Sequence, residues 1–206
     1  RLFWSALFII GGSVGGWFMF DVVFNELQRP IVELAAQPGS NATINFPTVV
    51  SAFDVRLQVS IFLGILMSAP VWLYNVWAFI TPGLKKRERR YTIGFVVAAV
   101  PLFIAGTFLA WSSLPTFVVV LVGFTPDGAA NVINASEYIL FTIRILLVFG
   151  LAFVLPVALV MLNFAGVITA ENIIKSWRMA VFVSAVVGAI ATPVAEPMAM
   201  FLLMIP

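Results

Sequence analysis

Long stretches without a charged residue dominate this chain and constrain its fold more than any other feature. About 20 apolar residues of α-helix are needed to cross the hydrocarbon core of a bilayer. Four stretches meet or approach that length, a fifth is shorter, and a sixth begins near the end of the sequence. They are residues 2–20, 57–84, 91–116, 138–168 (charge-free from 145), 179–192 and 198–206. The sequence therefore predicts an all-α, polytopic membrane protein with a single transmembrane domain, 1–206.

The overall composition supports lipid as the main solvent of the side chains. The chain is 62% hydrophobic and 10% charged, whereas soluble domains are about half apolar and a quarter charged. A net charge of +2 gives no reason to expect nucleic acid as a partner. Cysteine and histidine do not occur, which removes thiol chemistry and the commonest metal ligand and general base. We therefore expect neither a cofactor nor catalysis.

The charges that do occur are distributed unevenly between the spans. The tract KKRERR, residues 85–90, carries five basic side chains and one carboxylate, and the later connector carries Lys175 and Arg178. The connectors at 21–54 and 115–137 are acidic or neutral by comparison. Because Lys and Arg are enriched in cytoplasmic loops, this bias predicts that both basic loops and the N-terminus face the cytoplasm across the cell membrane.

Two further patterns concern packing and the membrane surface. GGSVGG, residues 11–16, contains two overlapping Gly-x-x-x-Gly spacings inside an apolar helix, which favour close helix packing over a nucleotide-binding loop. Tryptophans near the span ends are expected to be interfacial anchors. They are Trp17, Trp72, Trp77, Trp111 and Trp177.

Because the chain opens at Arg1 directly before a span, we expect a preceding segment to be missing and the sixth span to be cut short.

Three charged residues are candidates for a functional role. Glu88 is the one carboxylate in its basic tract, so it is either a solvated loop charge or a group that pairs with a guanidinium of a partner. Arg144 and Glu196 lie in or beside apolar spans, where ionisable groups are rare and face protein, water or each other. Arg144 could equally snorkel to the membrane surface. The residues alone leave both alternatives open.

The second span carries a specific motif. MSAPVWLYNVWAFITPGLKKRERR, residues 67–90, resembles the signature of the TatC family, which belongs to the twin-arginine protein translocase. Further segments resemble that family in the same order along the chain. They are PLFIAGTF at 101–108, Pro115, TPDG at 125–128, FGLAFVLPV at 149–157, ATP at 191–193 and EP at 196–197.

The resemblance implies a cupped bundle of six helices with both ends in the cytoplasm. It implies a receptor that binds the twin-arginine signal peptides of folded precursor proteins for export driven by the protonmotive force. Single-span TatA/TatB-type subunits would be its partners, in homo- and hetero-oligomers within the lipid bilayer. The family's cytoplasmic carboxylate falls on Glu88. Other positions that match the signal-binding face or its support are Phe79, Leu84, Arg90 and Pro70, and Glu196 matches an acidic position before the last helix.

The chain departs from the family pattern in two places. Val154 stands where many members carry a buried glutamate, so a role for that carboxylate is not carried over. The family's N-terminal amphipathic segment is absent, apart from Arg1. A small-molecule secondary transporter remains the alternative, since prolines inside helices and Arg144 would also suit one.

Overall fold

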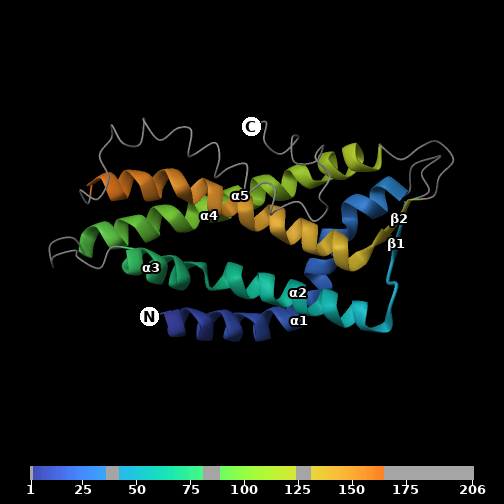
Figure 1. Ribbon diagram of the computed structural model, residues 1–206, viewed down its shortest axis with the longest axis horizontal. Helices are drawn as coiled ribbons and strands as arrows, with labels where there is room; N and C mark the ends of the chain where they lie inside the picture. The colour runs from blue at the N-terminus through green and yellow to red at the C-terminus, as the bar shows by residue number, and fades with distance from the viewer. Residues whose placement is uncertain (1, 36–41, 81–88, 124–130, 165–206) are drawn as a thin grey trace.

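The computed structural model describes residues 2–35, 42–80, 89–123 and 131–164, and its helices lie along the long axis of an elongated bundle (Figure 1). The helices and strands follow one another in the order α1 (Leu2–Ala35), β1 (Ala42–Asn45), α2 (Val49–Met67), α3 (Ala69–Ile80), α4 (Arg89–Val122), β2 (Asn131–Asn134) and α5 (Ala135–Phe164). The expected fifth and sixth spans lie outside the described residues.

Four of these helices are long and apolar enough to cross a membrane: α1, α2, α4 and α5. The prediction of a helical membrane protein is confirmed. Helix α1 packs mainly on α2, and α4 packs mainly on α5, while α2–α5 and α3–α4 contacts join the two pairs. One core lies among α1, α2, α4 and α5 around Leu27, Val59 and Leu146. A second, around Trp77 and Phe103, fixes α3 against α4.

The helices extend further than the hydrophobic pattern indicated. Helix α1 continues from the expected span 2–20 to Ala35, and α2 begins at Val49, so much of the expected connector 21–54 is helical. High hydropathy marks the part of a helix that faces lipid. Outside the lipid, a helix can continue when only one of its faces is apolar and buried. Leu27 and Ile31 supply that buried face.

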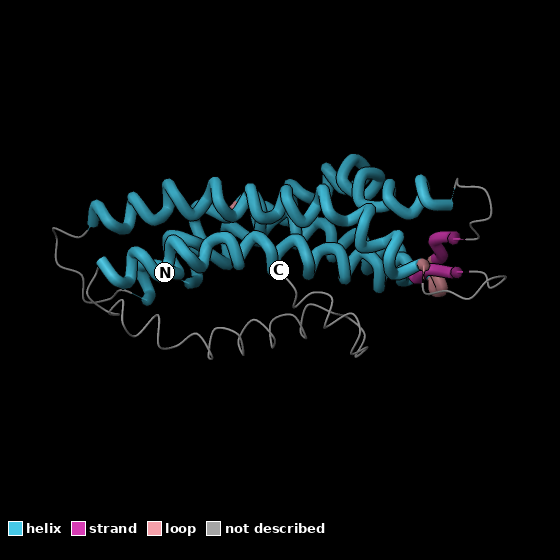
Figure 2. The backbone as a smooth tube through the Cα atoms, turned by 90° about the horizontal axis from the view of Figure 1, so that it is seen from above, coloured by secondary structure: helices cyan, strands magenta, loops and turns pink. Residues whose placement is uncertain are grey.

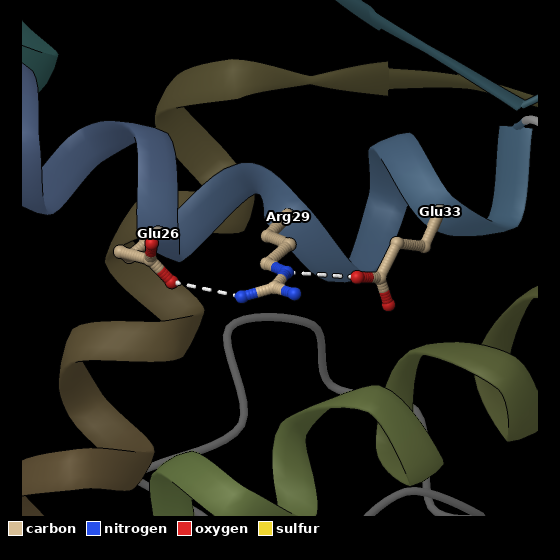
Figure 3. A network of polar contacts seen from close by, with 3 residues as sticks. All are labelled: Glu26, Arg29 and Glu33. Atoms are coloured by element: carbon tan, nitrogen blue, oxygen red, sulfur yellow. Dashed lines mark hydrogen bonds and ion pairs between the residues drawn. The ribbon is translucent and has the colours of Figure 1, made fainter.

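The opposite face of this extension is polar and exposed. Arg29 Nε donates to Glu33 Oε1 at 2.8 Å, and Arg29 Nη1 lies 3.6 Å from Glu26 Oε2 (Figure 3). These side chains are one helical turn apart and exposed, so water screens both pairs and they add little to the stability of the helix.

The expected second span is two helices rather than one. Helix α2 ends at Met67, where the carbonyl of Gly64 accepts the Ser68 N–H and also the Ser68 Oγ hydroxyl at 2.7 Å. Pro70 has no N–H to donate, and α3 starts one residue before it. The chain therefore bends between the two helices instead of crossing as one straight rod.

Helices α1 and α2 approach each other closely at small residues. A Cβ on Gly16 would lie 2.8 Å from Ser60 O, and a Cβ on Gly12 would lie 3.0 Å from the Gly64 carbonyl oxygen. The packing prediction is confirmed for this pair of glycines. Gly11 and Gly15 lie on the other side of α1, where a Cβ would meet nothing within 4 Å.

The bundle also contains a small sheet that the sequence pattern did not indicate. Strands β1 and β2 pair in parallel, with Ala42 opposite Asn131 and Asn45 opposite Asn134. They lie at one end of the bundle, away from the chain start (Figure 2). The strands join the two connectors that precede α2 and α5. The sequence did not indicate them because four residues are too few for an alternating pattern to stand out.

Candidate functional site

The candidate site lies where α3 ends at Ile80 and α4 begins at Arg89. Two aromatic contacts fix these helices against each other. Trp77 stacks on Phe95 with ring centroids 4.2 Å apart and planes 15° apart. Trp72 meets Phe103 edge to face at 5.5 Å. The two helix ends that flank residues 81–88 are therefore anchored, although Glu88 and Leu84 themselves lie outside the described residues.

Phe79 is the site residue that the structure places most clearly. It is 66% exposed, whereas Trp77, two positions earlier on the opposite face of α3, is 1% exposed. A large aromatic side chain at the end of α3 is thus free for contact. The expectation that Trp77 is an interfacial anchor was wrong, because its ring fills the core between α3 and α4.

The first turn of α4 has an unfavourable charge pattern. It begins with Arg89 and Arg90 and contains no acidic residue, although the N-terminus of a helix carries partial positive charge. A carboxylate placed near this end would offset both the dipole and the guanidinium groups. Glu88 immediately precedes Arg89 in the sequence, so a negative group is available one position away.

The start of α1 lies beside the middle of α3. Asn75 Nδ2 donates to Ser5 Oγ at 2.9 Å, and both residues are buried. Polar side chains that bond across helices in this way fix their register within a membrane. This contact ties the beginning of α1 to the helix that carries Phe79.

Pro70 lies at the other end of α3 from Phe79. Nine residues of helix separate them, or about 14 Å at 1.5 Å per residue. Pro70 is exposed at the junction of α2 and α3. The structure therefore does not bring Pro70 beside Phe79.

The structure does not bring Arg144 to this end of the bundle. Helix α5 continues for twenty residues beyond it to Phe164, which is about 30 Å along the helix. The end of α5 meets the start of α4, where a Cβ on Gly94 would lie 3.6 Å from Met161 Cε. Arg144 is half-buried and forms no hydrogen bond or ion pair with another described residue. Glu196 lies outside the described residues.

Two polar positions within the helices were missed from the sequence. Arg56 lies in α2, and Asn75 lies in α3 between buried apolar residues. A search for isolated polar side chains inside apolar stretches would have found Asn75, whereas Arg56 borders such a stretch, between Asp54 and Gln58. Such groups are costly in lipid unless they have a partner, so each indicates a specific contact.

Comparisons with known proteins agree on one family. A family model described as "Sec-independent protein translocase protein (TatC)" matches residues 1–206. A protein of that name from Xylanimonas cellulosilytica is 42% identical over the whole chain, which spans 75% of that relative. The namesake from Rothia mucilaginosa is 35% identical over 96% of this chain and 68% of its own length.

The solved structures that match are of the same family. A crystal structure of a twin arginine translocase receptor, TatC, superposes with a TM-score of 0.84 at 30% identity, covering 100% of this chain and 89% of that one. A second structure of a TatC receptor, in the detergent DDM, gives a TM-score of 0.82 at the same identity.

Proposed function

Because this chain belongs to the TatC family of Sec-independent protein translocase proteins, we propose that it is the receptor and core component of a twin-arginine translocase. It binds the twin-arginine signal peptides of folded precursor proteins, and export is driven by the protonmotive force. The N-terminus and the loop 81–88 face the cytoplasm, and single-span TatA/TatB-type subunits join it in a homo- and hetero-oligomeric complex. Translocation is a transport function, and family membership favours it over small-molecule secondary transport.

The observation that carries the proposal is the lone carboxylate that directly precedes α4 in the sequence. Glu88 is the one acidic residue in a tract with five basic ones and directly precedes Arg89. A carboxylate can accept two parallel hydrogen bonds from a guanidinium, and a signal peptide with paired arginines supplies two such groups. Glu88 is therefore the group that recognises the signal.

The basic side chains around Glu88 determine which interaction can provide the affinity for the signal peptide. The basic tract repels a positively charged peptide, so bulk attraction cannot provide the affinity. Hydrogen bonds to charged groups contribute on the order of 1.5–3 kcal/mol each, less where water reaches them. Binding therefore depends on the geometry of the Glu88–arginine pair.

The remaining matched positions surround that pair or support it. Exposed Phe79, together with Leu84, provides an apolar floor beside the carboxylate. Arg90 follows in the first turn of α4, and Pro70 sets the direction of α3. Arg144 and Glu196 are polar positions of the membrane domain and take no part in signal recognition.

The proposal is tested by crosslinking a signal peptide to the full-length protein in membranes. Glu88→Gln keeps the size of the side chain and loses the charge, so crosslinking of an Arg-Arg signal should fall several-fold at equal expression. Glu88→Asp should retain more of it. Glu137→Gln is the matched control, because Glu137 is an exposed carboxylate at the opposite end of the bundle. Undiminished, arginine-dependent crosslinking in Glu88→Gln would make Glu88 a solvated loop charge.

A further inference from the structure

Arg56 is held at the junction of α1 and α2 by aromatic side chains. Its guanidinium carbon lies 4.6 Å from the ring centroid of Trp17 and 5.1 Å from that of Phe20. Phe53 packs edge to face on Trp17, with ring centroids 6.0 Å apart. Cation–π contacts of this kind orient the plane of the guanidinium without neutralising its charge.

The hydrogen-bonding capacity of Arg56 is largely unused. Nη2 donates to Trp17 O at 3.5 Å, which is the long limit of a hydrogen bond. Nε is enclosed without a partner, and no hydrogen bond from Nη1 reaches another described residue.

Among the described residues, no carboxylate forms an ion pair with Arg56. Asp54 accepts from Gln58 at 2.7 Å and from Ser136 at 3.3 Å. Glu26 and Glu33 both pair with Arg29. Asp21, which follows Phe20 on α1, is exposed and also forms no ion pair with Arg56. Within the described ranges, the positive charge of Arg56 is therefore not paired with a carboxylate.

The position of Arg56 along the helices places it at a membrane surface. No charged residue occurs between Arg56 and the end of α3 at Ile80. These 24 residues would span about 36 Å as helix, slightly more than the roughly 30 Å of hydrocarbon. The basic tract follows at the far end, so Arg56 lies at the opposite edge of the bilayer. The abundant anion at that depth is the phosphate of lipid headgroups.

An apolar stripe runs inward from this point along α2. Leu57 and Ile61 are 38% and 49% exposed, and they lie one helical turn apart on the membrane side of Arg56. An acyl chain below a headgroup would lie along such a stripe. The arrangement thus offers a cation for the headgroup and an apolar surface for the tail.

We propose that Arg56, backed by Trp17 and Phe20, is a binding site for the phosphate group of a phospholipid, on the membrane surface opposite the basic tract. The guanidinium donates from Nη1 to a phosphate oxygen, and the lipid tail packs along Leu57 and Ile61. The site rests on the membrane-spanning fold alone and does not depend on signal-peptide binding.

Native mass spectrometry of the purified full-length protein tests this site. Phosphatidylglycerol should bind wild type about five times more tightly than Arg56→Gln, since one basic residue at a membrane surface contributes about that factor. Arg56→Lys should retain part of the binding. Arg29→Gln is the matched control, because it removes a cation that is exposed and already paired, and it should bind like wild type.

Wild type alone provides a second measurement that does not depend on any variant folding. Dioleoylglycerol, which has tails but no phosphate, should bind weakly, and inorganic phosphate should not displace phosphatidylglycerol. Equal binding of dioleoylglycerol and phosphatidylglycerol would overturn the proposal. So would Arg56→Gln with a lower melting temperature but unchanged lipid binding, since Arg56 would then only fasten α1 to α2. Displacement by inorganic phosphate would overturn it as well, because the site would then bind anions without specificity for lipid.

Discussion

At the scale of single residues, polar side chains in the described helices mostly serve packing. Ser60, Ser68 and Thr107 each donate to a carbonyl one turn earlier in their own helix, which satisfies the hydroxyl inside an apolar bundle. Asn75 differs because its partner, Ser5, belongs to another helix. This bond connects the start of α1 to the helix that ends at the candidate site.

Asn75→Leu should therefore loosen α1 from α3. Interhelical hydrogen bonds in membrane proteins contribute about 0.6 kcal/mol on average and up to about 1.7, so a melting temperature in detergent a few degrees lower is expected. Ser5→Ala should have a similar effect, and the double variant should lose no more than either single one. Fully additive losses would mean that the two side chains do not act as a pair.

At the scale of elements, a close contact between α1 and α2 depends on the absence of side chains. A Cβ on Gly64 would lie 2.6 Å from Ile9 O and 2.7 Å from Ser13 N and would also collide with Ser13 Oγ. Two of these atoms are backbone, so α1 would have to move away. Gly11, on the other face of α1, has open space instead.

Gly64→Ala and Gly11→Ala form a matched pair for this contact. Gly64→Ala should destabilise the protein by about 1–3 kcal/mol, the usual cost of overpacking a tight interface. Gly11→Ala should leave stability unchanged or slightly raised, since alanine favours helix more than glycine does. Thermal unfolding followed by circular dichroism measures both. Similar melting temperatures for the two variants would rule out a close α1–α2 contact at Gly64.

Sequence patterns predicted the elements inside the membrane better than those outside it. Charge-free runs located the cores of α1, α2, α4 and α5, because lipid demands apolar side chains along the whole depth. Lipid imposes no such requirement on the extension of α1 to Ala35 or on the β1–β2 pair, so neither left a comparable pattern in the sequence. The bend at Ser68 depends on a cap and on Pro70 together, and a continuous apolar run conceals it. For the site, motif resemblance indicated Glu88 and Phe79, whereas Arg56 required the three-dimensional contact with Trp17 to be noticed.

At the scale of the whole molecule, charge differs between the two ends of the bundle. The end with the strands carries Asp21, Glu26, Glu33, Asp54 and Glu137 against Arg29 and Arg56 among the described residues, while the other begins α4 with two arginines. Since basic loops are retained in the cytoplasm, we expect this asymmetry to orient the bundle with Phe79 on the cytoplasmic side.

The orientation is testable by labelling single cysteines in intact cells with a reagent that does not cross the membrane. The chain has no native cysteine, so each introduced thiol reports alone. Ser40→Cys and Asn131→Cys should be labelled, and Lys86→Cys should be labelled only after the cells are broken. The reverse pattern would place the basic loop outside and remove the basis for a cytoplasmic receptor.

The central claim is that the carboxylate that directly precedes α4 in the sequence pairs with the arginines of an export signal, and a double-mutant cycle tests it most directly. Binding of a fluorescent Arg-Arg peptide and of its Gln-Gln counterpart would be measured with full-length wild type and Glu88→Gln in nanodiscs. Direct pairing predicts a coupling free energy of about 1.5–3 kcal/mol, so that Gln-Gln binds both proteins equally weakly. A coupling near zero, with Arg-Arg preferred equally by both proteins, would contradict the account.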